Sequence, residues 1–342
     1  MVIGENTAVR AVAVLFFSVF LALLLVWVAP KLGLVDLPHG RKRHARPTPL
    51  VGGLVFWSVL SVLGALGAVD LGLNAWDWVA LHVMGLVGLL DDIFALRART
   101  KMLVGLLVAL LLALVHGKAL LALGGSYHLL GMVLPNVAYV TFPLLFLWLW
   151  FLPQAINLMD GINGLVVGFS LICLWLLGAP WLLLLPLGVI LLFNYPKARL
   201  FLGDCGALLL GTLLAILAIK GRLPHNPDGI FILFIYPMVD VSLVVISRLR
   251  RRQPLGMGDR SHLHHRVTDL VSRVPWLATP LILLMALGLR IFVELGVGAS
   301  SLRAFGPLLF LVFTGLILLG RSLFTKDMLG NTLGSPQGGG AS

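Results

Sequence analysis

Long apolar runs dominate the chain, and short polar or basic segments separate them. A bilayer core of about 30 Å requires roughly 20 apolar residues per helix. The pattern predicts an all-α, polytopic integral membrane protein with eleven transmembrane helices. They are expected near residues 8–29, 50–68, 77–91, 102–116, 138–153, 162–178, 181–194, 205–220, 229–247, 275–293 and 304–320. Pro186 predicts a kink in the seventh of them.

The composition supports a membrane protein, since 59% of the residues are hydrophobic and 11% are charged, with a mean hydropathy of +1.03. The first run follows no basic cluster and precedes no clear cleavage site, so we expect a retained helix rather than a signal peptide. Residues 1–325 are expected to form one transmembrane domain, and the Gly/Ser-rich stretch within 326–342 predicts a disordered tail.

Lysine and arginine are concentrated on alternate loops, which sets the expected orientation. The sparsely basic side holds only Arg10, Lys118, Lys220, Arg222, Arg290 and Arg303. The positive-inside rule makes the other side cytoplasmic and places the N-terminus outside. The net charge of +11 is explained better by membrane orientation and by binding of anionic ligands than by binding of nucleic acid.

Acidic residues lie at the cytoplasmic ends of the predicted helices. They are Asp91, Asp92, Asp160, Asp204, Asp240 and Asp259. Ionisable residues at membrane depth are candidates for function, and these share a face with most of the arginines. Carboxylates hold Mg²⁺ while Arg and Lys neutralise phosphate. The sequence therefore predicts a cavity for a metal-bound, multiply charged phosphate ligand.

Two motifs flank the predicted helices in the middle of the chain. Asn157, Asp160 and Asn163 recur every three residues, so a helical start would place them on one face; the alternative is an Asx-rich turn that caps a helix. Asp204 opens the eighth helix, where it is either an N-cap or a metal ligand. Asp240 lies inside the ninth helix and needs a partner, which leaves structural pairing as its alternative role.

The last long loop carries three histidines among arginines, namely Arg260, His262, His264, His265 and Arg266. Neither a cysteine nor a further histidine completes a zinc site at suitable spacing. We expect these side chains to donate to phosphate or sugar oxygens, and a solvated basic loop is the alternative. In the first cytoplasmic loop, Arg46 adds a cation that an orientation signal alone would also explain.

Five motifs in order give the chain a family resemblance over roughly residues 35–270. The matching stretches are Arg46–Gly53, Gly88–Lys101, Asn157–Gly164, Phe201–Gly206 and Asp259–His265. They resemble those of the polyprenyl-phosphate N-acetylhexosamine-1-phosphate transferases, in glycosyltransferase family 4. The His-Leu-His-His form is similar to the undecaprenyl-phosphate N-acetylglucosamine-1-phosphate transferase branch, and less similar to the phospho-N-acetylmuramoyl-pentapeptide transferases.

The resemblance implies a reaction in a bacterial inner membrane. Undecaprenyl phosphate would attack the β-phosphorus of a UDP-N-acetylhexosamine and release UMP, as the first membrane step of a cell-surface glycan. The implied cofactor is Mg²⁺, with Mn²⁺ as the alternative, and the oligomeric state stays open between a monomer and a homodimer.

The resemblance also implies a role for each motif residue. Asp204 would bind Mg²⁺, Asp91 and Asp92 would be the catalytic carboxylates, and Lys101 would contact phosphate. The implied substrate-binding residues are Arg46, Asn157, Asp160, Asn163, Asp240, Arg260, His262, His264 and His265. Asn163 departs from the Asp of many members, which puts its role in doubt. Rival readings are a transporter for an anionic metabolite and a lipid-binding scaffold.

Overall fold

The structure is a computed structural model that describes residues 5–38, 46–129, 132–221, 227–250, 252 and 262–296. The predicted helix at 304–320, the predicted tail within 326–342, and Arg260 lie outside the described residues.

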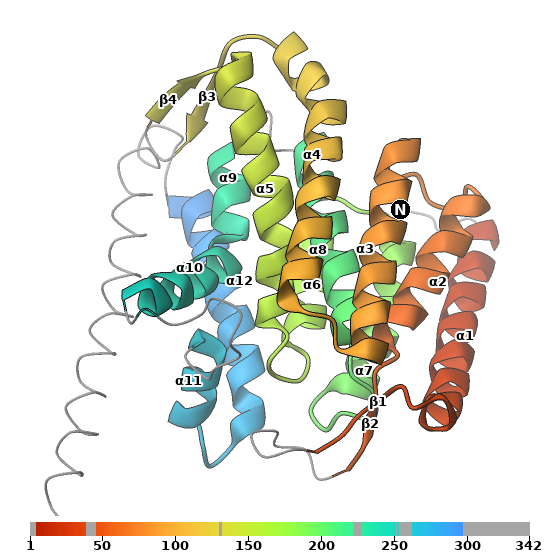
Figure 1. The fold of residues 1–342 in the computed structure, drawn as a ribbon. Helices are drawn as coiled ribbons and strands as arrows, with labels where there is room; N and C mark the ends of the chain where they lie inside the picture. Colours follow the sequence, from red (N-terminus) through yellow and green to blue (C-terminus); the bar gives the residue numbers. More distant parts are fainter. Residues whose placement is uncertain are drawn as a thin grey trace, which may run out of the picture.

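The described residues form mainly helices (Figure 1). The helices are α1 Glu5–Val28, α2 Gly52–Ala65, α3 Ala75–Phe94, α4 Ala98–Ala122, α5 Ala138–Met159, α6 Leu165–Leu176, α7 Leu184–Asn194, α8 Gly203–Lys220, α9 Pro227–Leu233, α10 Ile235–Arg250, α11 Leu263–Leu270 and α12 Ala278–Gly296. Strand β1 (Val35–Asp36) pairs antiparallel with β2 (Thr48–Pro49), and β3 (Ser126–Leu129) pairs antiparallel with β4 (Met132–Pro135).

The protein is embedded in a membrane. Among the described residues, four segments are long and apolar enough to cross a bilayer: Thr7–Leu32, Ala98–Ala122, Ala138–Met159 and Gly203–Lys220. Shorter apolar helices accompany them, and large apolar side chains such as Phe16, Phe20 and Leu107 are exposed on the outside of the bundle. An apolar exterior of this kind is suited to lipid rather than to water.

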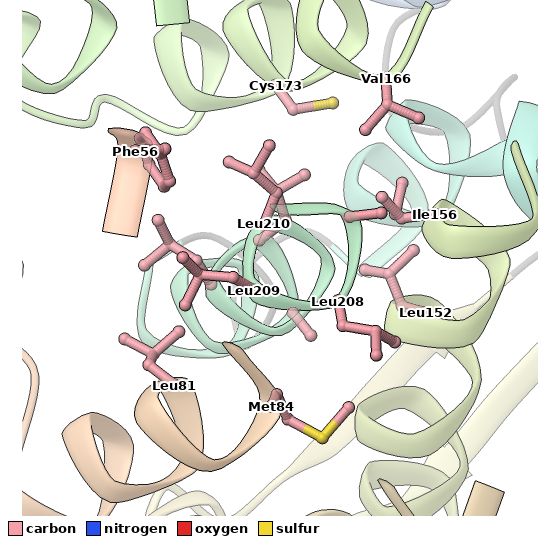
Figure 2. Close-up of a cluster of buried hydrophobic side chains, with 14 of the residues drawn as sticks. Phe56, Leu81, Met84, Leu152, Ile156, Val166, Cys173, Leu208, Leu209 and Leu210 are labelled. Carbon is pink, nitrogen blue, oxygen red and sulfur yellow. The ribbon is translucent and has the colours of Figure 1, made fainter. Parts of the chain in front are cut away.

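Helix α8 lies at the centre of the bundle and is apolar on nearly every side, as a fully enclosed helix must be. Figure 2 shows its leucines surrounded by Leu81 and Met84 of α3, Leu152 and Ile156 of α5, and Phe56 of α2. This core holds the first turn of α8 in a fixed place at one end of the bundle.

Two glycines bring neighbouring backbones against that first turn. A Cβ added to Gly53 of α2 would lie 2.2 Å from the backbone nitrogen of Gly206, and one added to Gly88 of α3 would lie 2.3 Å from the carbonyl oxygen of Asp204. Because no side chain fits at either position, both contacts require glycine.

Three sequence predictions differ from the structure. The single helix at 229–247 is wrong, since the chain breaks at Phe234 into α9 and α10, which Figure 1 draws at a steep angle to one another. Pro237, which has no N–H, lies in the first turn of α10 and favours a new start there. The predicted seventh helix is a 3-10 turn at Trp181–Leu183 followed by α7, and Pro186 lies in the first turn of α7 rather than in its interior. The all-α prediction also omits the β3–β4 hairpin, which lies between the predicted helices at 102–116 and 138–153.

At the opposite end of the bundle, a buried ion cluster joins three helices. Asp77 of α3 is fully buried; its Oδ1 lies 2.6 Å from Nε2 of His116 in α4, and its Oδ2 lies 2.8 Å from Nζ of Lys220 in α8. The sequence analysis missed this cluster, although Asn74 and Asp77 have the spacing of the helix capping box that they form.

Candidate active site

Four helix ends meet where the sequence analysis expected the cytoplasmic face. Helices α3 and α5 end there, and α4 and α8 begin there. As a result, Asp91 and Asp92 in the last turn of α3 lie next to Lys101 at the start of α4 and Asp204 in the first turn of α8. Residues that are more than 100 positions apart in the chain thus form one polar cluster.

Lys101 is the cation at the centre of this cluster. Its Nζ lies 2.6 Å from Oδ2 of Asp91 and also donates to Oδ2 of Asp204. The Asp204 side chain keeps 30% of its surface exposed, against 17% for Lys101 and 13% for Asp91. The two carboxylates therefore share one ammonium group while Asp204 stays open to an incoming ligand.

Asp92 faces the backbone of α8 instead. Its Oδ1 accepts a hydrogen bond from the Asp204 N–H at 2.8 Å, and its Oδ2 accepts one from the Cys205 N–H at 3.0 Å. A carboxylate on the free N–H groups of a helix start also interacts favourably with the helix dipole. Asp92 thus acts as the cap of α8, a contribution from another helix that the sequence analysis did not predict.

The Asn157 motif occupies a helix end rather than a helix start. Asn157 lies in the last turn of α5 and Asp160 caps that helix, after which Gly164 adopts a left-handed φ of 78°. The predicted single helical face is therefore wrong, because the chain leaves the helix between the first and third motif residues. The Asn163 Nδ2 donates to the Pro196 carbonyl oxygen at 3.0 Å.

Asn157 turns toward the carboxylate cluster. Its Nδ2 lies 3.4 Å from Oδ2 of Asp204. Its Oδ1 is buried and has no hydrogen-bond partner within the described part of the chain. Buried polar atoms in folded proteins nearly always have a partner. A bound metal ion or a substrate N–H or O–H group would be such a partner for this amide oxygen.

Asp160 remains partly in contact with solvent at the rim of the same cluster. The surrounding protein removes much of the water from its carboxyl group and raises its pKa to about 8, and the charges of Asp204 and Asp92 act in the same direction.

The predicted histidine segment forms a second cluster around Asp240 of α10. The Asp240 Oδ2 lies 3.0 Å from Nδ1 of His262 and 3.4 Å from Nδ1 of His264. Ligand atoms of these three residues all lie within 4.8 Å of one another, a spacing that could hold a metal ion. The structural pairing considered for Asp240 is therefore present, although its partners are histidines.

Arg46 lies just before strand β2, and its side chain is exposed. The strand leads to the polar cluster, because the Phe201 N–H donates to the Pro49 carbonyl oxygen at 2.7 Å and Gly52 donates to Phe201 at 2.9 Å. Arg46 is thus carried on a segment that is tied to the start of α8.

The carboxylate cluster has the donor atoms that a hard divalent cation requires. Asp91 and Asp204 offer carboxylate oxygens that already share one cation, and Asn157 offers an unpaired amide oxygen. Mg²⁺ prefers oxygen ligands of this kind. The residues present therefore fit the metal expected from the sequence.

Comparison with known proteins shows one family. The family model described as "Glycosyl transferase family 4" matches residues 75–222, which carry α3 through α8. A Bacillus subtilis (strain 168) protein, named "Probable undecaprenyl-phosphate N-acetylglucosaminyl 1-phosphate transferase", is 30% identical over 70% of this chain and 71% of its own length.

Two further relatives are both named "Undecaprenyl-phosphate alpha-N-acetylglucosaminyl 1-phosphate transferase". The Yersinia pestis protein is 29% identical over 79% of this chain and 78% of its own length, and the Escherichia coli (strain K12) protein is 29% identical over 80% and 78%. The similarity extends over most of both chains and includes the helices that form the carboxylate cluster. The chain therefore belongs to glycosyl transferase family 4, and the expected resemblance is confirmed.

Proposed function

We propose that this protein transfers N-acetylglucosamine 1-phosphate from UDP-N-acetylglucosamine to undecaprenyl phosphate in an Mg²⁺-dependent reaction. The observation that carries the proposal is the convergence of Asp91, Lys101, Asn157 and Asp204 from four helices at one end of an apolar bundle. The names of the relatives support the choice of both substrates.

In the proposed reaction, an oxygen of the lipid phosphate forms a bond to the β-phosphorus of the UDP-sugar. The bond from that phosphorus to the oxygen bridging the α-phosphate breaks, and UMP leaves with the electron pair. A phosphate monoester has a second pKa of about 6 and is mostly deprotonated at neutral pH. Proton removal is therefore a minor task, and positioning and charge neutralisation account for most of the catalysis.

The described side chains divide these tasks. Lys101 neutralises phosphate oxygens once substrate competes for its ammonium group, and Asp91 orients it through the 2.6 Å contact. Asp204, with the Asn157 amide oxygen beside it, would hold Mg²⁺, which supplies charge neutralisation at the transferring phosphate when bound. Asp92 fixes Asp204 in place through the backbone of α8.

An apolar cavity supports a lipid substrate. The cavity has a volume of about 400 Å³ and lies along α5, from the β3–β4 hairpin to α10, with Trp148, Phe151, Leu152 and Met238 in its wall. Helix α5 carries Asn157 in its last turn and helix α10 carries Asp240, so the same two helices reach the polar clusters. A polyprenyl tail in this cavity would leave its phosphate near the helix ends.

The proposal includes the topology and the cellular location. Eleven spans with the N-terminus outside would place the carboxylate cluster in the cytoplasm, where UDP-sugars are made available, and the enzyme in a bacterial inner membrane. The Lys/Arg asymmetry supports this orientation.

The direct test supplies purified protein with undecaprenyl phosphate and a panel of UDP-sugars. UDP-N-acetylglucosamine with Mg²⁺ or Mn²⁺ should give a lipid-linked diphosphate sugar, and excess chelator should abolish the product. Asp204→Asn should insert in the membrane and lose turnover. Undiminished turnover in the chelator, or by the variant, would refute the metal assignment.

A further inference from the structure

One buried carboxylate organises the start of helix α11. The Asp240 side chain of α10 is 1% exposed, and its Oδ1 accepts a hydrogen bond from the Leu263 N–H at 2.5 Å. Its Oδ2 faces Nδ1 of both His262 and His264, at 3.0 and 3.4 Å. Asp240 therefore satisfies a helix N-terminus, is hydrogen-bonded to His262, and lies within ion-pair distance of His264, whose Nδ1 makes no hydrogen bond within the described part of the chain.

The Nε2 edge of the His264 ring packs against Gly161, in the segment that follows α5. A Cβ added to Gly161 would lie 2.2 Å from Nε2 of His264, so only glycine allows this approach. Gly161 follows Asp160 directly in the 157–164 loop, which comprises the last turn of α5, with Asn157 of the carboxylate cluster, and the residues up to Gly164. The Asp240 and His264 side chains thus form a direct link from α10 to the rim of the candidate active site.

The three histidines differ in their access to a ligand. His262 and His264 are 5% and 1% exposed, with their Nδ1 atoms turned to Asp240. His265 is only partly buried, and its ring centroid lies 4.3 Å from that of His264. A buried ring can meet a substrate only if α11 moves, whereas His265 already lies next to the loop-facing His264.

We propose that Asp240, His262 and His264 are positioning residues that dock α11 against the 157–164 loop, and that His265 is the histidine that contacts the phosphate or sugar of the donor. The identity of that donor rests on the proposed function above. Small displacements at a reacting centre can lower rates by about a hundredfold, so a loosened α11 is costly for donor use even though no docking residue touches substrate.

Histidine labelling with diethylpyrocarbonate, read by mass spectrometry on the full-length protein, tests the docking independently of turnover. In the wild type we expect His265 to be modified and UDP-N-acetylglucosamine to protect it, while His262 and His264 stay unmodified. Asp240→Asn should expose His262 and His264 to the reagent, because an amide cannot accept from both Leu263 and His262.

A second variant reaches the same contact from the opposite side and leaves the buried carboxylate in place. Gly161→Ala should push His264 away and expose it. Gly188→Ala, with open space around its added Cβ, is the matched glycine control. Asp70→Asn is the matched control for the carboxylate, since the Asp70 Oδ1 that accepts from the Gly72 N–H is kept as an amide oxygen.

The KM values for the two substrates then distinguish a positioning role, which affects the donor alone, from a general loss of structure, which affects both substrates. Asp240→Asn and Gly161→Ala should each raise the KM for UDP-N-acetylglucosamine about tenfold or more in the folded protein, with the KM for undecaprenyl phosphate close to wild type, even though both variants melt at a lower temperature. His265→Gln should raise the same donor KM without exposing His262 or His264.

Several results would overturn the proposal. They are wild-type donor kinetics in both docking variants, protection of His264 instead of His265 by donor, or a stoichiometric metal ion that Asp240→Asn removes. In the last case the cluster would be a metal site. If the wild type does not use UDP-N-acetylglucosamine, the proposed function fails, while the labelling of the docking variants still decides how α11 is held.

Discussion

Asp92 provides the sharpest test of how the carboxylates divide their roles. If it caps α8, replacing it with Asn should destabilise the protein, because one of the two hydrogen bonds to the Asp204 and Cys205 N–H groups is lost together with the charge. A hydrogen bond to a charged group contributes roughly 1.5–3 kcal/mol, and a charge at a helix start contributes about 0.3–1 kcal/mol. The expected loss is about 2–4 kcal/mol.

Asp91→Asn is the matched control, since the Asp91 carboxylate accepts from Lys101, whereas Asp92 accepts from the backbone N–H groups at the start of α8. Thermal unfolding in detergent, followed by tryptophan fluorescence, should show a clear loss of stability for Asp92→Asn and a smaller one for Asp91→Asn. Gly203→Ala should mimic Asp92→Asn, because Gly203 has a φ of +74° and its added Cβ would lie 2.6 Å from the Asp92 carboxylate. Wild-type stability in Asp92→Asn would refute the capping role.

Three further outcomes are expected. Asp77→Asn should cost about 1–3 kcal/mol of stability, because the partly buried Lys220 and the buried His116 lose the charge of their shared partner, while turnover per folded molecule, measured on the surviving fraction, stays near wild type. The pKa of Asp160 is raised from 3.8 to about 8, so between these pH values the folded protein keeps a proton that the unfolded chain releases. The free energy of unfolding should therefore fall as the pH rises through this range. Thermal melts of Asp160→Asn across the same range should show a flatter dependence on pH. Single cysteines at Ser126 and Ser272, in a background without the natural cysteines, should label from opposite sides of the membrane, and labelling of both in intact cells by an impermeant reagent would contradict the topology.

The sequence predicted the parts of the fold that depend on local patterns. Apolar runs located the long helices, and the placement of Asp91, Asp92 and Asp204 at helix ends correctly indicated that they would gather. The break at Phe234 was missed, because the apolar pattern runs through it without interruption and only Pro237 marks a new helix start.

Contacts between distant segments were beyond the reach of the sequence. The Asp92 carboxylate caps a helix that begins more than 100 residues later, and Asp77 at the start of α3 meets Lys220 at the end of α8. Both pairings arise from the packing of α3 along α8, which the glycines at the contact permit. Nor does sequence spacing distinguish His265 from the buried His264, since burial depends on where α10 and the 157–164 loop lie.

The central claim is that a sugar phosphate, rather than a sugar, is transferred at the carboxylate cluster. The most direct measurement follows UDP-N-acetylglucosamine labelled at its β-phosphorus, incubated with undecaprenyl phosphate, Mg²⁺ and purified protein. The label should enter the lipid fraction, the nucleotide released should be UMP, and Asp204→Asn should give neither. Label that remains in the aqueous phase as UDP while sugar enters the lipid would contradict this claim.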